Sequence, residues 1–159
     1  ACLMHDLGKG STPANLWPRH IGHEQRSAKL AQGVADRLKV STECRALADV
    51  VAREHGHIHQ SDGLGAEATL RLLERCDALR RPDRFAHVLQ ACECDARGRL
   101  GLQDRAYAPA HRLAHALQQV LSVDTEPVVS QAQAQGLDGP ALGQAVRQAR
   151  ILALEAPSV

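Results

Sequence analysis

Apolar residues recur at intervals of three and four along nearly all of this 159-residue chain. Between Ile21 and Leu38, for example, Ala28, Ala31, Ala35 and Leu38 fall on one stripe. This spacing is typical of a helix that buries one face. No convincing stretch alternates apolar and polar residues as a half-buried strand would. The pattern therefore predicts an all-α fold with this stripe buried.

Capping and turn residues delimit the other expected helices. Ser41 can cap the second helix, whose buried stripe we expect to include Cys44 and Val51. Pro82 suits the first turn of a helix that runs to about Arg97. The remaining helices are expected at about 67–79, 109–121, 125–136 and from 139 onward. The irregular stretch 7–20 is long for a compact helical domain, and such loops are usually functional.

The composition limits what the core and the surface can do. Hydrophobic residues make up 44% of the chain, which is ample for one core, but Trp17, Phe85 and Tyr107 are its only aromatic residues. So few aromatic side chains argue against a protein that binds single-stranded nucleic acid by stacking its bases. The formal net charge of +1 means that any nucleic-acid surface has to be a local patch.

The sequence carries no stretch long enough to span a membrane and no signal peptide. Its five cysteines include no CxxC pair, so we expect reduced, mostly buried thiols in a cytoplasmic protein. The first residue is alanine, and no capping residue precedes the first apolar run. We therefore expect this chain to be cut from a longer one inside a helix.

Two familiar motifs are incomplete. The run "GKGST" resembles a phosphate-binding loop, but Gly10 stands where Ser or Thr has to follow Gly-Lys. The run "HEQRS" begins like a zinc-protease helix, but Ser27 stands where the second histidine belongs. We reject both interpretations.

Histidines and a carboxylate fall on inward helix faces. His55 and His59 continue the stripe of Val51 at intervals of four, whereas His57 points about 200° away. Asp95 follows the buried stripe of its own helix, three residues after Cys92. An alternative for His55 is a core histidine whose ring is satisfied by a hydrogen bond. An alternative for Asp95 is a salt bridge to a nearby arginine.

Taken together, these residues predict a metal site. His5 and Asp6 lie side by side in an apolar setting, where a charge is costly unless it is paired or bound to a metal. With His23, His55 and Asp95 they supply imidazole and carboxylate ligands from separate segments. This mixture suits Mn, Fe, Co, Ni or Mg better than a structural zinc site. Such an ion generates hydroxide near neutral pH and neutralises phosphate charge.

The ordered series "HDLGKG", "HIGHE", "REHGHIH" and "ACECDARGR" resembles the HD-domain phosphohydrolase superfamily. With "RCDALRRPDRF" and the tail "GLDGPALGQAVRQARILAL", it is similar to the C-terminal HD region of bacterial CCA-adding tRNA nucleotidyltransferases. The resemblance covers essentially the whole chain. It implies an HD-domain helical bundle over residues 1–122, truncated at its N-terminus, and a small helical tail over 123–159 that binds tRNA.

The resemblance also implies roles for individual residues. His5, Asp6 and Asp95 would be the metal ligands, and His23 and His55 would be ligands or phosphate contacts. Lys9 would meet a phosphate oxygen, the alternative being a solvated loop lysine. The implied reaction is hydrolysis of 2′,3′-cyclic phosphodiester, 2′-nucleotide and phosphomonoester bonds with a divalent metal, often nickel, at tRNA 3′ ends.

Two departures from the family pattern matter. The first superfamily ligand is a histidine upstream of the HD pair, and this chain begins four residues before His5. We therefore expect the isolated chain to be an impaired hydrolase. The nucleotidyltransferase head, which uses magnesium, is a missing partner of this chain, because no Gly-Ser followed by paired aspartates occurs in it. A homodimer of the full-length protein is compatible with the sequence.

One dense group of basic residues is a candidate tRNA contact. Phosphate contacts position nucleic acid without reading its bases, which makes such a stripe compatible with a tRNA-binding domain; solvated helix ends are the alternative. Other readings of the whole chain are a non-catalytic helical tRNA-binding module with a decayed HD site and a stand-alone nucleotide hydrolase. The basic group consists of Arg80, Arg81, Arg84, Arg97 and Arg99.

Overall fold

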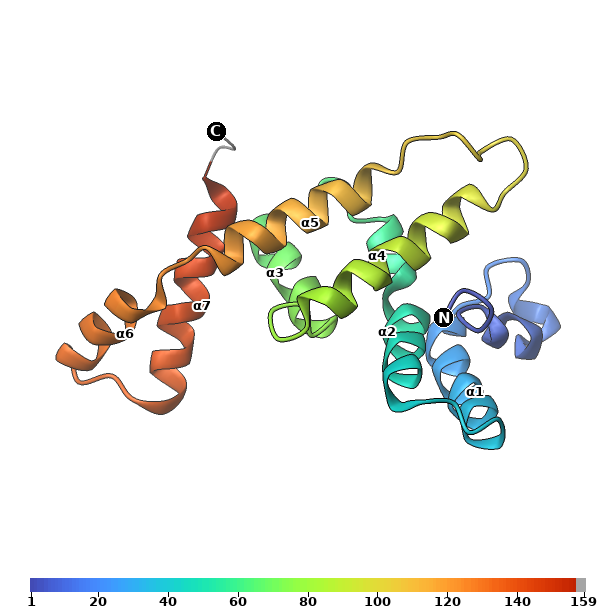
Figure 1. Ribbon diagram of the computed structural model, residues 1–159, viewed down its shortest axis with the longest axis horizontal. Helices are drawn as coiled ribbons and strands as arrows, with labels where there is room; N and C mark the ends of the chain where they lie inside the picture. Colours follow the sequence, from blue (N-terminus) through green and yellow to red (C-terminus); the bar gives the residue numbers. More distant parts are fainter. Residues whose placement is uncertain (157–159) are drawn as a thin grey trace.

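A computed structural model describes residues 1–156 of the chain (Figure 1). Within this range every regular element is helical, which confirms the all-α prediction. The last three residues of the expected tail, 157–159, lie outside the described range. The 3-10 helices are η1 (Leu7–Ser11) and η2 (Ala14–Leu16), and the α-helices are α1 (His23–Arg37), α2 (Thr42–His59), α3 (Ala66–Arg75), α4 (Pro82–Arg97), α5 (Ala108–Leu121), α6 (Thr125–Ala134) and α7 (Gly139–Glu155).

Local chemistry explains where several helices begin and end. The Ser41 side chain accepts a hydrogen bond from the backbone N–H of Cys44 and caps α2, as expected. Pro82 occupies the first turn of α4, also as expected. Helix α3 is shorter than the predicted 67–79, because Asp77 adopts a left-handed backbone with φ of 53°.

Two expected core positions are wrong. Ala28, Ala31 and Ala35 are buried on α1, but Leu38 is 64% exposed because the helix ends at Arg37 and the chain turns away. Cys44 lies in the exposed first turn of α2, one turn before its buried face begins. Both errors occur at helix ends: the spacing pattern runs past the end of α1 at Leu38, and at Cys44 it begins before α2 meets its neighbours.

The N-terminal segment differs from the expected end of a helix. Residues 1–6 form turns, in which the amide of His5 donates to the Ala1 carbonyl at 3.1 Å. The stretch 7–20 is the irregular segment that the sequence predicts, with η1 and η2 inside it. Helix α1 packs against η1 and so fixes this segment beside the bundle.

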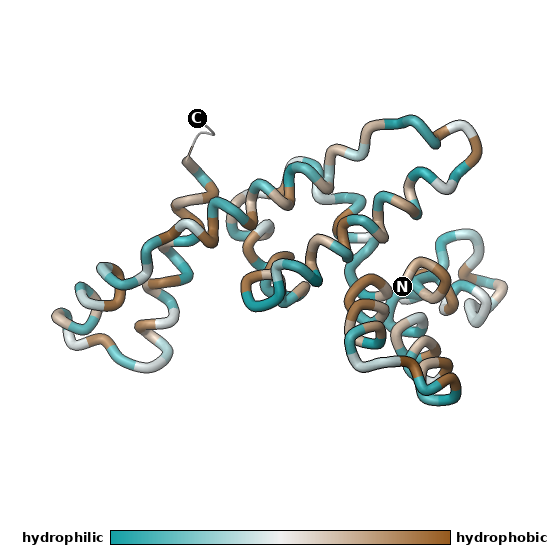
Figure 2. Tube along the Cα trace, in the orientation of Figure 1, coloured by the Kyte–Doolittle hydropathy of each residue, from teal (hydrophilic) through white to brown (hydrophobic). Residues whose placement is uncertain are grey.

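The helices form an elongated array (Figure 1). The N-terminal segment, α1 and the first turns of α2 lie at one end, α6 and α7 lie at the other, and α4 and α5 run between them. Helix α2 packs on both α1 and α4, and therefore connects the N-terminal segment to the centre. Hydrophobic and hydrophilic residues alternate along each helix (Figure 2). The buried hydrophobic residues form a core around Ile58, Leu70, Phe85, Val88 and Leu113.

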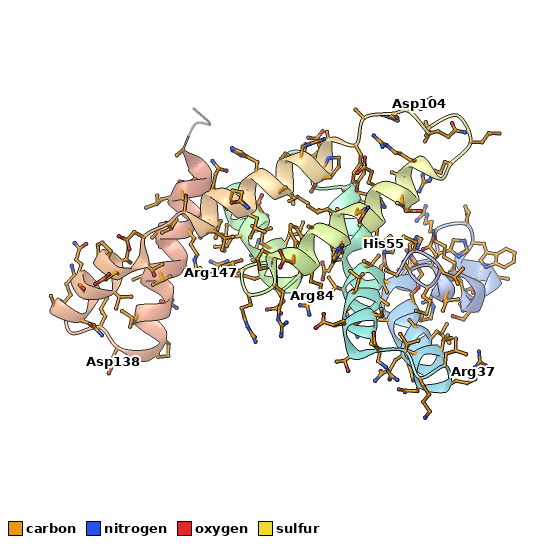
Figure 3. All side chains as sticks on the ribbon, viewed as in Figure 1. Arg37, His55, Arg84, Asp104, Asp138 and Arg147 are labelled. Carbon is orange, nitrogen blue, oxygen red and sulfur yellow. The ribbon has the colours of Figure 1, made fainter. Side chains whose placement is uncertain are left out.

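The C-terminal helices dock on the central part. Helix α7 packs on α3 and α5, and α6 packs on α7. The Arg147 guanidinium on α7, labelled in Figure 3, lies 3.5 Å from the Glu67 carboxylate and 3.4 Å from that of Glu74, both on α3. The proposed boundary between 1–122 and 123–159 falls just before α6 and stays a prediction.

The cysteines are free, but they are not mostly buried. Cys76 and Cys92 are buried in the core, whereas Cys2, Cys44 and Cys94 are exposed. Among the described residues, no helix combines the length and the apolar character needed to cross a membrane.

Candidate metal centre

Three predicted site residues meet beside the start of η1. One ligand atom from each of His5, Asp6 and His55 lies within 4.8 Å of the other two. His5 comes from the N-terminal turns, Asp6 immediately precedes η1, and His55 is buried on α2. Figure 3 labels His55 on the side of α2 that borders the N-terminal segment. We call these three residues the HD cluster.

Backbone carbonyls fix the proton positions on the imidazoles. His5 Nδ1 lies 2.7 Å from the Cys2 carbonyl oxygen, and His55 Nδ1 lies 3.0 Å from that of Val51. Because a carbonyl only accepts, both Nδ1 atoms carry the proton and both Nε2 atoms keep a lone pair. His23 follows the same rule, with Nδ1 3.1 Å from the carbonyl oxygen of His20. Metal-binding histidines typically have this backbone support.

The resulting lone pairs face one another without a proton between them. His5 Nε2 and Asp6 Oδ1 are buried and have no hydrogen-bond partner. Asp6 Oδ1 nevertheless lies 3.2 Å from His23 Nε2 and 3.6 Å from His55 Nε2, and the two imidazole nitrogens lie 3.4 Å apart. Acceptors that face one another in this way favour a bound cation. The residues present therefore fit a divalent metal ion.

The environment favours the neutral form of His55 and the ionised form of Asp6. Burial lowers the pKa of His55, so its imidazole is neutral at pH 7. Burial of Asp6 raises the pKa of its carboxyl, but the hydrogen bond from Lys9 and the neighbouring histidines outweigh this and lower it overall. Lys9 Nζ donates to Asp6 Oδ2 at 2.6 Å.

Asp95 lies next to the HD cluster. Its Oδ1 is 3.4 Å from His5 Nε2. The convergence of His5, Asp6 and Asp95 on one ion stays a prediction, because the ligand atoms that lie within 4.8 Å of one another come from His5, Asp6 and His55. The alternative for Asp95 is a salt bridge to Arg97, Arg99 or another nearby arginine. Among the described residues Asp95 instead pairs with His5 and His59.

Sequence reasoning missed two residues of this site. Asp95 Oδ2 accepts a hydrogen bond from His59 Nε2 at 2.8 Å, and His59 Nδ1 lies 2.8 Å from the hydroxyl of Tyr107. The inward stripe of α2 indicated that His59 faces the interior but not what it meets. Nothing in the sequence indicated Tyr107, which is 48 positions away from His59.

The glycine of "HDLGKG" allows the segment to approach α1 closely. A Cβ on Gly8 would lie 2.2 Å from the His23 carbonyl oxygen and 2.7 Å from the Ser27 amide nitrogen. The Gly8 amide donates to Ser27 Oγ at 2.9 Å, and Arg26 donates to the Gly8 carbonyl at 3.3 Å. These contacts hold Asp6 in place beside His23 and His55.

A cavity of about 520 Å³ opens beside the HD cluster. Its volume is in the range of small-molecule sites. Among the described residues, the loop 98–107 contributes two arginines to its lining, Arg99 and Arg105, that form no ion pair with a carboxylate. Other lining residues are Lys9, His23, His55, His59, Asp95, Arg97, Tyr107 and Arg112.

The five arginines of the candidate tRNA contact do not form one patch. Helix α4 separates Arg80, Arg81 and Arg84 at its start from Arg97 and Arg99 at its end, by about 22 Å at 1.5 Å per residue. The Arg84 guanidinium donates to Asp77 Oδ2 at 2.7 Å and its side chain is only 17% exposed. Arg97 and Arg99 instead border the cavity.

Comparison with known proteins places the chain in a family. The model of the HD domain matches residues 1–87, which hold His5, Asp6, His23 and His55. The chain belongs to the HD domain family. The match to this HD domain ends within α4, before Asp95.

Curated relatives extend the similarity beyond the HD domain. The Multifunctional CCA protein of Paracidovorax citrulli (strain AAC00-1) is 63% identical over 150 residues, which cover 94% of this chain and 36% of that protein. The Multifunctional CCA protein of Verminephrobacter eiseniae (strain EF01-2) is 60% identical over 154 residues, 97% of this chain and 37% of that protein. The chain thus spans little more than a third of these relatives. No solved structure gave a significant match.

Proposed function

We propose that this chain is the C-terminal part of a CCA-adding tRNA nucleotidyltransferase and acts as a metal-dependent phosphohydrolase. The observation that carries the proposal is the HD cluster, whose buried His5 Nε2 and Asp6 Oδ1 have no hydrogen-bond partner. The similarity to Multifunctional CCA proteins over most of the chain supports the tRNA context.

A bound divalent ion would supply hydroxide near neutral pH and would neutralise phosphate charge. In our proposal His5, Asp6 and Asp95 hold this ion, with His55 as a further ligand. Nickel suits the imidazole and carboxylate set. His23 completes the pocket wall against Asp6, and Lys9, which lies 2.6 Å from Asp6, reaches a phosphate oxygen of the substrate.

The cavity supports the choice of substrate. Arg99 and Arg105 bring positive charge to a cavity that Asp62 and Asp95 also line, and neither arginine forms an ion pair among the described residues. A volume of about 520 Å³ suits a nucleotide. We propose 2′,3′-cyclic phosphodiesters, 2′-nucleotides and phosphomonoesters as substrates. Trimming of damaged tRNA 3′ ends, in the cytoplasm, is the proposed setting.

The tRNA itself would contact the basic residues beside the cavity and the tail. Arg97 and Arg99 lie where an RNA end would enter, and Arg80 and Arg81 could meet the backbone farther along α4. Arg84 contributes less, since Asp77 already pairs with it. CCA addition, with its magnesium and nucleotides, is assigned to the nucleotidyltransferase head, outside these residues.

The test is nickel-supplemented hydrolysis of a 2′,3′-cyclic nucleotide by the 159-residue chain and its variants. Asp6→Asn removes a central carboxylate of the HD cluster, and we expect at least about a 100-fold loss of rate. Asp104→Asn, in the exposed part of the loop 98–107, is the matched control and should keep the full rate. A rate that is independent of nickel, or unchanged in Asp6→Asn, would contradict the proposal.

The absolute rate tests the expected upstream ligand. Because the superfamily pattern places a further histidine before the HD pair, we expect the 159-residue chain to be a weak hydrolase. Fusing the preceding segment of the Paracidovorax citrulli relative to the chain should raise the nickel-dependent rate. Equal, robust rates for the two chains would show that this histidine is not an essential ligand.

A further inference from the structure

Two consecutive hydrogen bonds connect a phenol to the candidate ligand Asp95. The Tyr107 hydroxyl lies 2.8 Å from His59 Nδ1, and His59 Nε2 lies 2.8 Å from Asp95 Oδ2. Both distances are in the ordinary range for good hydrogen bonds. The two rings meet edge to face with centroids 5.7 Å apart, so the contact also fixes the orientation of the imidazole.

Both hydrogen bonds are donated in the same direction, from Tyr107 to His59 and from His59 to Asp95. A carboxylate only accepts, so His59 Nε2 carries the proton that is shared with Asp95. In a neutral imidazole Nδ1 is then the acceptor, and the Tyr107 hydroxyl donates to it. Burial raises the pKa of this hydroxyl, which keeps it in the donating form.

This arrangement leaves one oxygen of Asp95 for the HD cluster. Oδ2 is occupied by His59, and Oδ1 lies 3.4 Å from His5 Nε2. Rotation of the carboxylate would break the bond to His59 and turn Oδ1 away from the cluster. We propose that His59 and Tyr107 are positioning residues that hold Asp95 in the orientation of a metal ligand. This inference rests on the proposed metal-dependent function.

The positions of the three residues in the fold support this role. His59 is the last residue of α2, Asp95 lies in the last turn of α4, and Tyr107 immediately precedes α5. The ends of three helices are therefore linked by these two hydrogen bonds. His59 and Tyr107 also line the cavity, so the contact is at the site and not elsewhere in the core.

Cobalt(II) binding by the 159-residue chain tests the proposal, with affinity from titration calorimetry and ligand geometry from the visible spectrum. His59→Leu removes the donor to Asp95 and should weaken binding about 10–100-fold. Tyr107→Phe removes only the hydroxyl and should weaken binding by a smaller factor, with a changed cobalt spectrum. His59→Gln keeps an N–H donor and should restore most of the affinity lost in His59→Leu.

His87→Leu on the exposed face of α4 is the control for loss of a histidine and should bind cobalt like the unaltered chain. Thermal unfolding of each variant verifies that it folds. Equal affinities and spectra for the unaltered chain, His59→Leu and Tyr107→Phe would overturn the positioning role alone. So would His59→Gln binding as weakly as His59→Leu. No Asp6-dependent cobalt binding by the unaltered chain would overturn the proposed function and the positioning role together.

Discussion

Gly8 lies where the segment that carries His5 and Asp6 crosses the first turn of α1. Its missing side chain is a requirement of this crossing, since a Cβ would lie 2.2 Å from the His23 carbonyl oxygen and 2.9 Å from Arg26 Cβ. These neighbours are backbone atoms of α1 or, for Arg26, the Cβ attached to its backbone, so they cannot move aside without shifting α1.

We predict that Gly8→Ala destabilises the fold by about 1–3 kcal/mol, the usual cost of overpacking. It should also weaken cobalt binding, because the displaced segment carries Asp6. The control is Gly10→Ala in the same segment, where a Cβ would meet no atom within 4 Å; its effect should stay within about 0.5 kcal/mol. Urea unfolding measures both, and equal stabilities would contradict the close approach.

At this scale the sequence predicts most of the cluster but not its surroundings. Helical spacing distinguishes buried His55 from exposed His57, because two residues turn the helix by about 200°. The same spacing places Asp95 inward. It cannot identify Tyr107 as the partner of His59, since that contact depends on how α2 and α5 pack and not on either helix alone.

Helix α2 is the element on which the site depends most, because it carries both His55 and His59. Its first turn is capped by Ser41, whose side chain accepts from the Cys44 amide at 3.4 Å. A cap satisfies a backbone donor that the helix itself leaves unpaired.

We predict that Ser41→Ala lowers the free energy of unfolding by about 1 kcal/mol, the typical value of a lost N-cap. Ser41→Asp keeps an acceptor at the same position and should retain full stability. Cobalt affinity should be unchanged in both, because the cap lies at the opposite end of α2 from His55. Chemical denaturation monitored by far-UV circular dichroism measures the difference, and a destabilised Ser41→Asp would argue against the cap.

Helix boundaries with a chemical signal were predictable, and those without one were not. Ser41 and Pro82 mark starts that the structure confirms. The early end of α3 depends on the left-handed backbone at Asp77. Aspartate tolerates this conformation, but its presence in the sequence does not predict it. The 3-10 helices within 7–20 are likewise too short to produce a periodic pattern.

On the scale of the whole molecule, the reactivity of the five cysteine thiols indicates which parts of the chain are buried. Burial raises the pKa of Cys76 and of Cys92 to about 12, so neither forms a thiolate near neutral pH. We predict that a thiol reagent at pH 8 modifies Cys2, Cys44 and Cys94 in the folded chain, and the other two only after unfolding. Mass spectrometry of the labelled chain identifies the sites.

The same pKa values predict how stability depends on pH. The folded-state pKa of these two thiols lies above 9.0, the ordinary pKa of an exposed thiol. Above pH 9 the unfolded chain therefore loses thiol protons that the folded chain keeps, and folding becomes less favourable as the pH rises. Replacing both residues by alanine should flatten this alkaline slope, measured by denaturation between pH 8 and 11. An unchanged slope would contradict the burial of the two thiols.

The hydrogen bonds from Tyr107 through His59 to Asp95 join the two ends of the loop 98–107 at its base. Lengthening a loop whose ends are fixed costs only about 0.6 kcal/mol per doubling, and Leu100 within it is 97% exposed. During evolution, insertions in this loop could therefore change which molecules enter the cavity while the proposed metal ligands stay where they are. The substrate range of such a protein can diversify while its chemistry is inherited unaltered.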